Sequence, residues 1–177
     1  GRSLAHLASV PLGYDTHDVL AFQVQLPQED GAGGEEAWRA YTSEVIRRIA
    51  ALPGVSAAGA TSRLPFTPGL GRGTDVRSSP DAEETNASRT DVWPGYFRAM
   101  GIPILEGNPF SAGEPPDERG VVLSASLARA LFGDGPATGR TLQVPRTREE
   151  WEERRVRAVV GDVKLRGRQW TGWEAMM

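Results

Sequence analysis

Apolar and polar residues alternate in the second half of residues 19–27, which read Val-Leu-Ala-Phe-Gln-Val-Gln-Leu-Pro. This period of two is typical of a half-buried β-strand. Aromatic and aliphatic residues then recur at spacings of three and four, namely Trp38, Tyr41, Val45, Ile49 and Leu52. That spacing predicts an amphipathic helix, opened by two glutamates and stopped by Pro53-Gly54. Since residues 55–64 read as a second strand, the first third is predicted to be a β-α-β unit.

The last third repeats this order. Val121-Val122-Leu123 is a short apolar run of the kind found in buried strands. Ser124 is placed to cap a helix with Leu127 on its apolar face, and Gly133 is placed to end it. Residues 141–145 and 155–163 read as two strands, separated by the charged residues 146–154. The prediction is a second β-α-β unit with one further strand.

Between these units the chain is rich in proline and glycine. Residues 65–81 favour loops and short edge strands. Residues 86–92 read as a strand, residues 94–101 as a helix of one to two turns, and residues 102–105 as an extended stretch. We therefore expect an α/β (α+β) fold in which two β-α-β units form a sandwich, interrupted by a smaller β-rich inserted subdomain.

Composition narrows the functional classes. The 177 residues include 20 basic and 23 acidic side chains, a net charge of −3, and no cysteine. The lack of cysteine excludes disulfides, thiolate zinc sites, iron–sulfur clusters and cysteine nucleophiles. A near-neutral charge argues against nucleic-acid binding. The apolar runs fall short of the roughly 18 residues of a membrane span, and neither a signal peptide nor an initiator methionine opens the chain, so we expect an excised piece of a longer protein.

The sequence contains neither of the common phosphate-binding loop patterns. The single lysine, Lys164, does not follow a glycine-rich loop, so no Walker A motif can be written. Residues 69–73, Gly-Leu-Gly-Arg-Gly, lack the spacing and the following helix of a dinucleotide-binding turn. We interpret them as a flexible loop.

The histidines give one weak catalytic candidate. His6 and His17 are the only two, and Asp15 and Asp18 flank His17. A carboxylate–histidine site of a small hydrolase-like enzyme is conceivable there, although no Gly-x-Ser-x-Gly elbow supplies a nucleophile. A surface turn rich in Asp, Thr and His is the favoured interpretation.

A second candidate lies between the final strands, where Glu149, Glu150, Glu152 and Glu153 could supply the two carboxylates of glycoside chemistry. The favoured interpretation is a solvated face, because Arg148 and Glu152, and Glu150 and Arg154, stand four apart and would pair on a helical turn. No catalytic residue, metal ligand or cofactor site is therefore predicted.

The tryptophans suggest an interaction surface instead. Trp38 and Tyr41 are interpreted as core contacts of the first helix. Trp151, Trp170 and Trp173 lie in polar, arginine-rich surroundings. An exposed indole in such surroundings marks a partner surface or the membrane boundary. The interpretation that we favour is that each ring is half-buried and covers the edge of a sheet.

Several segments, in order, carry a resemblance to a known family. They are residues 13–15 leading to 19–22; residues 51–55 and 58–61; residues 96–107, Tyr-Phe-Arg-Ala-Met-Gly-Ile-Pro-Ile-Leu-Glu-Gly; residues 121–133; Gly139-Arg140; and residues 159–163, Val-Val-Gly-Asp-Val. Together they resemble the periplasmic core domain of MacB-type ABC transporter permeases, the group related to FtsX. Departures occur at Asn108-Pro109, in the turn at residues 135–139 and in the longer stretch at residues 147–153.

The resemblance implies a non-catalytic domain on the outer side of the cell membrane that transmits ATP-driven movement to substrate or partner proteins. It implies a division into a membrane-proximal approach segment (1–18), a first porter-like half (19–64), an inserted Sabre-like subdomain (65–118), a second porter-like half (119–167) and a tail (168–177). The implied partners are a cognate ABC ATPase, a second permease copy and an extracytoplasmic protein. The alternatives are the small hydrolase-like enzyme and a freestanding ligand- or peptide-binding module.

Overall fold

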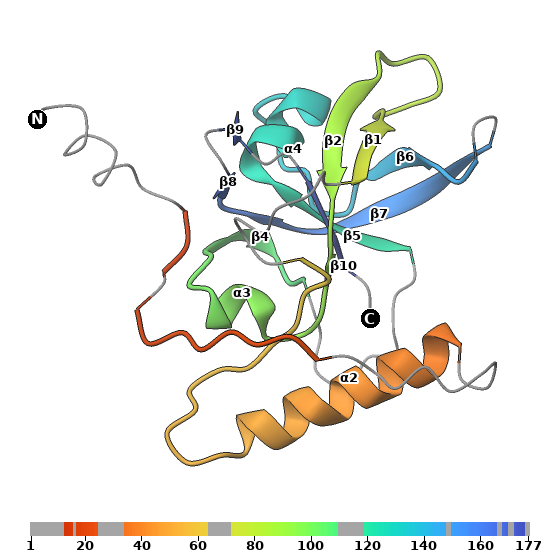
Figure 1. Ribbon diagram of the computed structural model, residues 1–177. Coiled ribbons are helices and arrows are strands. Elements are labelled where there is room, and N and C mark those ends of the chain that lie inside the picture. Colours follow the sequence, from red (N-terminus) through yellow and green to blue (C-terminus); the bar gives the residue numbers. More distant parts are fainter. Residues whose placement is uncertain are drawn as a thin grey trace, which may run out of the picture.

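The computed structural model describes residues 13–15, 17–24, 34–63, 72–109, 119–147, 150–165, 168–169 and 172–175. The helices are α2 (Glu35–Ala50), α3 (Tyr96–Ala99) and α4 (Ala125–Phe132). The strands are β1 (Arg72–Val76), β2 (Thr85–Arg89), β3 (Asp91–Val92), β4 (Ile104–Gly107), β5 (Gly120–Ser124), β6 (Thr141–Pro145), β7 (Trp151–Val160), β8 (Lys164–Leu165), β9 (Arg168–Gln169) and β10 (Gly172–Ala175). This mixture of helices and strands confirms the predicted α/β class (Figure 1).

A six-stranded sheet organises the molecule. Its order is β3-β10-β5-β7-β4, and β6 also pairs with β7. β5 and β7 run parallel and are joined through α4 and β6, whereas β6 and β4 pair with β7 in the antiparallel sense. The second β-α-β unit with its further strand is therefore confirmed.

Apolar side chains cover both faces of this sheet. On one face Val122, Ala158 and Val160 pack with α3, and on the other Val121 and Leu123 pack with α4 and the β1–β2 hairpin. Neighbouring residues of a strand point to opposite faces, so β5 needs apolar side chains on both, which Val121, Val122 and Leu123 supply. All five of its residues are buried.

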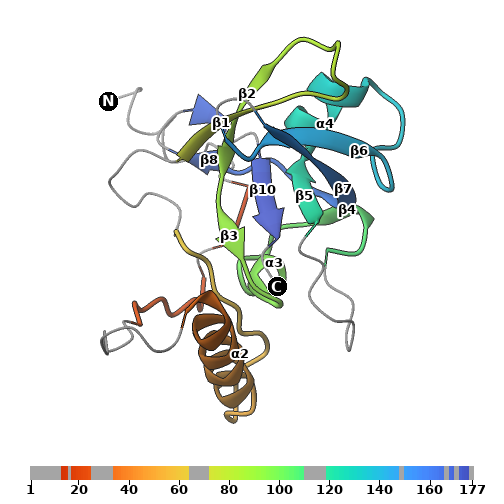
Figure 2. The ribbon, with the colours of Figure 1, turned by 90° about the vertical axis from the view of Figure 1, so that its right-hand side faces the viewer.

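The β1–β2 hairpin lies over the sheet rather than apart from it (Figure 2). Its Val76 and Ala87 belong to the same apolar cluster as β5 and α4. Arg77 pairs with Gln143 of β6 through two backbone hydrogen bonds of 3.1 and 2.8 Å. The division of the chain into five parts remains a prediction.

The first β-α-β unit is not formed as predicted. Residues 19–24 belong to no strand, and residues 25–27 lie outside the described part. Residues 55–63 contribute only an isolated bridge from Thr61 to Val92. Residues 58–59 cross the start of α3 at close range, and residues 60–62 contact only the two-residue strand β3 (Asp91–Val92), so the strand predicted over residues 55–64 is wrong.

The helix of this unit is confirmed as α2, but its packing differs from the prediction. Trp38 and Tyr41 stack on each other at 6.4 Å, and Tyr41 is 40% exposed. Neither ring belongs to the two apolar clusters. α2 lies below the sheet in both views (Figures 1 and 2), so the interpretation of these rings as core contacts is wrong.

The charged stretch before the last strand is also different. β7 begins at Trp151, four residues before the predicted start, and pairs with β6. Glu152 and Arg154 form an ion pair two residues apart, because alternate residues of a strand share a face. The helical turn expected there is wrong, because Trp151–Val160 is a strand; Arg148 and Glu149 lie outside the described residues, so the predicted pair of Arg148 with Glu152 stays untested.

Candidate functional site

Three segments that are distant in sequence meet beside α3: residues 13–15, residues 100–103 and residues 161–163, which we call the junction. The Asp15 amide donates a hydrogen bond to the Met100 carbonyl at 2.9 Å, and the Gly161 amide donates to the Pro103 carbonyl at 2.9 Å. The turn between α3 and β4 thus touches both residues 13–15 and the stretch that follows β7.

Gly13 and Asp162 approach each other closely within the junction. Its φ is +82°, and a Cβ added there would stand 2.0 Å from the Asp162 carbonyl oxygen. Only glycine combines this backbone conformation with such an approach. The approach segment is therefore held directly against the residues that follow β7.

Asp162 connects the junction to α4. Its Oδ1 accepts a 2.9 Å hydrogen bond from the Ser126 amide in the first turn of that helix. Ser124 Oγ accepts a second from the Leu127 amide at 3.3 Å, which confirms Ser124 as the N-cap. Both acceptors satisfy backbone donors that a helix leaves unpaired.

Apolar contacts hold the same region together. Tyr14 packs against the cluster that contains Tyr96, Phe97 and Val163. Burial raises the pKa of the Tyr96 hydroxyl well above its usual value of 10, and the neighbouring Tyr14 adds to this rise; burial also raises the pKa of Tyr14. These tyrosines stay neutral at any physiological pH.

A second close crossing lies at the start of α3. A Cβ added to Gly95, whose φ is +87°, would stand 1.9 Å from the Ala58 carbonyl oxygen. One at Gly59 would stand 2.2 Å from the Tyr96 amide nitrogen. The Trp93 amide donates to the Ala60 carbonyl at 2.9 Å. The stretch that follows α2 is thereby tied to β3 and α3.

The weak catalytic candidate is not assembled. The His17 side chain is 92% exposed and its Nδ1 lies 2.9 Å from Asp15 Oδ1. A hydrolase-like site would need His17 in a pocket with residues of the last third, and the structure places it in a solvent-facing turn instead. His6 lies outside the described residues.

Glu152 and Trp151 of the β6–β7 hairpin each contact an arginine side chain. Glu152 pairs with Arg154, and the half-buried Trp151 ring lies 4.0 Å beneath the Arg77 guanidinium. This supports the half-buried interpretation of Trp151. Trp170 and the side chain of Trp173 lie outside the described part.

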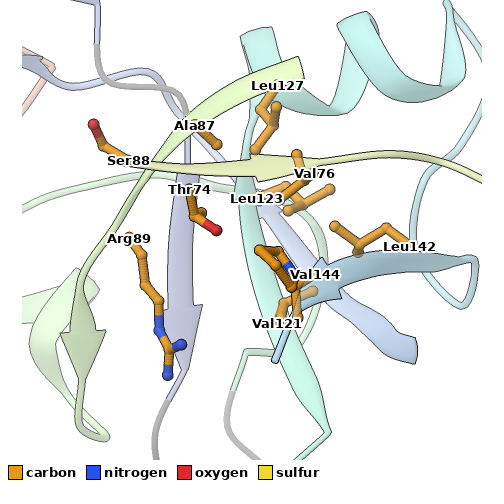
Figure 3. A pocket seen from close by; sticks show the side chains of 11 residues that line it. Thr74, Val76, Ala87, Ser88, Arg89, Val121, Leu123, Leu127, Leu142 and Val144 are labelled. Carbon is orange, nitrogen blue, oxygen red and sulfur yellow. The ribbon is translucent and has the colours of Figure 1, made fainter. Parts of the chain in front are cut away.

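A small groove lies between the β1–β2 hairpin and the sheet (Figure 3). Val76, Ala87, Val121, Leu123, Leu127, Leu142 and Val144 form its floor, with Thr74, Ser88, Arg89 and Pro145 around it. The cavity volume of the groove is about 40 Å³. The groove admits a small apolar group rather than a ligand of drug size, which typically needs about 300–1,000 Å³.

Within the described ranges no group of three or more His, Asp or Glu side chains could hold a metal ion. The same ranges contain no helix that is long and apolar enough to cross a membrane.

Comparison with known families identifies the chain. Residues 9–169 match the family described as MacB-like periplasmic core domain. The chain belongs to this family. A stretch of 62 residues, 34% of the chain, is 40% identical to the macrolide export ATP-binding/permease protein MacB of Chromobacterium violaceum. That stretch covers 10% of the relative, so the chain corresponds to a small part of it.

Among solved structures, one with a TM-score above 0.5 supports the fold. A permease-protein domain from Porphyromonas gingivalis matches with a TM-score of 0.51 and 18% identity, over 75% of this chain and 54% of that one. The periplasmic region of MacB from Actinobacillus actinomycetemcomitans matches with a TM-score of 0.46 and 17% identity, over 73% and 54% of the two chains.

The junction itself was not predicted from the sequence. The motif residues Gly13-Tyr14-Asp15 and Gly161-Asp162-Val163 were noted only as carriers of the family resemblance. The available signals were a glycine in each motif, since glycine permits close backbone approach, and Asp162, since aspartate accepts from helix amides.

Proposed function

We propose that this chain is the domain of an ABC transporter permease that stands on the outer side of the cell membrane and relays ATP-driven movement. In this proposal the residues before Gly13 and those after Val163 lead toward membrane helices. The cognate ABC ATPase supplies the energy from the other side. Substrate, a second permease copy or an extracytoplasmic partner protein receives the movement.

The observation that carries the proposal is the junction. Residues 13–15 and 161–163 touch each other and are held to α3 through Met100 and to α4 through Ser126. A displacement applied to either segment must move both helices and the sheet between them, because close-packed interiors transmit strain. The domain would then move as one body.

The test uses the full-length permease with its ATPase in lipid nanodiscs. With any cysteines outside this chain replaced, Glu83→Cys carries one spin label per permease copy, at an exposed position of the β1–β2 hairpin. Distances between the labels of two permease copies should change on binding of an ATP analogue. Gly13→Val should abolish that change while ATP binding persists.

Gly135→Val is the matched control, because a Cβ at Gly135 meets nothing within 4 Å. It should respond to the nucleotide like the unmodified permease. A Gly13→Val permease that responds equally well would contradict the proposal. So would label distances that stay unchanged on nucleotide binding in the permease without this substitution.

A further inference from the structure

The ladder between β1 and β6 stops after a single bridge. Arg77, just after β1, exchanges two backbone hydrogen bonds with Gln143 of β6. If an antiparallel ladder continued from there, Asp75 would lie opposite Pro145. Proline has no N–H and cannot donate a ladder hydrogen bond. The groove opens beside this bridge, between Thr74 of β1 and β6 (Figure 3).

The backbone of β1 presents hydrogen-bonding groups on this open edge. Backbone groups of successive residues point alternately to the two sides of a strand. Since those of Arg77 point to β6, those of Asp75 and Gly73 point the same way. Within the described ranges, β2 is the only strand that pairs with residues 72–76. An unpaired strand edge is a template for pairing with another chain.

The side chains of β1 alternate in the same way. Gly73 and Asp75 are exposed on the outer face, whereas Thr74 and the buried Val76 line the groove. A strand added to this edge would likewise direct every second side chain into the groove. With an apolar floor and a volume of about 40 Å³, the groove suits one short aliphatic side chain, whose burial favours binding.

Charges on the two faces of the hairpin specify the neighbouring positions. Arg89 lines the groove with its side chain 38% exposed, 3.9 Å from Asp91. A guanidinium carries five N–H donors, so it can also bind an acidic side chain that enters the groove. On the outer face Asp75 accepts a 3.0 Å hydrogen bond from Asn86 and favours a basic side chain opposite it.

We infer that the open edge of β1 binds an extended segment of an extracytoplasmic partner protein as an added strand. The segment pairs through its backbone with Gly73 and Asp75. It places an aliphatic side chain in the groove, an acidic one beside Arg89, and a basic one opposite Asp75. The inference gives the chemistry of the partner and rests on the proposed function for the side of the membrane on which the partner lies.

A peptide with this alternation tests the inference. The probe is fluorescently labelled Lys-Val-Lys-Glu-Lys with both ends blocked, and its binding to the full-length permease in lipid nanodiscs is followed by fluorescence anisotropy without nucleotide. Replacing its valine by alanine should weaken binding about tenfold, because the groove then buries less apolar surface. Equal affinities of the two peptides would overturn the inference.

Two variants at one position isolate the backbone contact. Asp75→Pro removes the N–H on the open edge, and the matched control Asp75→Ala removes the same carboxylate but keeps that N–H. Neither change removes a donor to β2, because the backbone groups of Asp75 point away from it. Asp75→Pro should bind the peptide at least about fivefold more weakly than Asp75→Ala. Equal binding by the two variants would contradict strand addition.

Hydrogen exchange in the unsubstituted permease gives a test without any variant. The amides of Gly73 and Asp75 should exchange freely without the peptide and become protected with it. Protection before the peptide is added would overturn the inference, because another segment of the permease or a second copy would then hold the edge. Continued free exchange at saturating peptide would also overturn it. The nucleotide-dependent distances from Glu83→Cys are measured without peptide, so failure of the relay and failure of strand addition are distinguished.

Discussion

The crossing at Gly95 offers a quantitative test of the packing. In Gly95→Ala the new Cβ would stand 1.9 Å from the Ala58 carbonyl oxygen, so the two backbones must separate by about 1 Å to reach an allowed contact. That movement weakens the hydrogen bond from the Trp93 amide to Ala60, and an unsatisfied buried donor costs about 1–3 kcal/mol. The positive φ adds about 1–2 kcal/mol.

Gly54→Ala isolates the contact from the φ effect. Gly54 has a φ of +84° but nothing within 4 Å of an added Cβ. Gly95→Ala should therefore have a free energy of unfolding about 2–3 kcal/mol below that of Gly54→Ala, a Tm about 5–10 °C lower for a chain of this length. Urea unfolding of both variants measures the difference, and values within 0.5 kcal/mol of each other would refute the close crossing.

Three smaller predictions concern single side chains. Leu142→Ala removes a fully buried side chain and should lower the free energy of unfolding by about 2–5 kcal/mol in urea titrations, whereas a loss below 1 kcal/mol would argue against its burial. Ser124→Ala should cost about 1 kcal/mol in the same titrations through loss of the N-cap, and a loss near zero would argue against capping. Glu44 is held by hydrogen bonds from Arg47 and Arg48, which lower its pKa from 4.5 to about 2. Its contribution to α2 is therefore present above pH 4.5 and lost as the pH falls toward 2, so a carboxyl NMR titration should show the low pKa and Glu44→Gln should remove this pH dependence; an ordinary pKa would contradict the pairing.

The sequence was most informative where one segment determines its own structure. The apolar run of β5, the Ser124 cap and the glycine after α4 act within a few residues, and each lies where it was predicted. The sequence was least informative about partners. A period of two says which side chains of a strand share a face, but it does not say which strand lies beside it.

The charged residues before β7 show a related limit. Spacings of four between Arg and Glu fit a helical turn, yet the same letters also contain charge pairs at spacings of two, which fit a strand. Pairing with β6 and the cation–π contact of Trp151 with Arg77 favour the strand. Arg77 is distant in sequence, so the pattern of the charged residues alone could not decide between the two.

The junction explains why the relay can be tested at one position. Gly13 is held by a contact that leaves no room for a Cβ, and Asp15 is held by the hydrogen bond from its amide to the Met100 carbonyl. A pull transmitted through Gly13 would therefore act directly on α3 and on the residues that follow β7. If Gly13→Val leaves the nucleotide-dependent movement intact, the relay proposal fails.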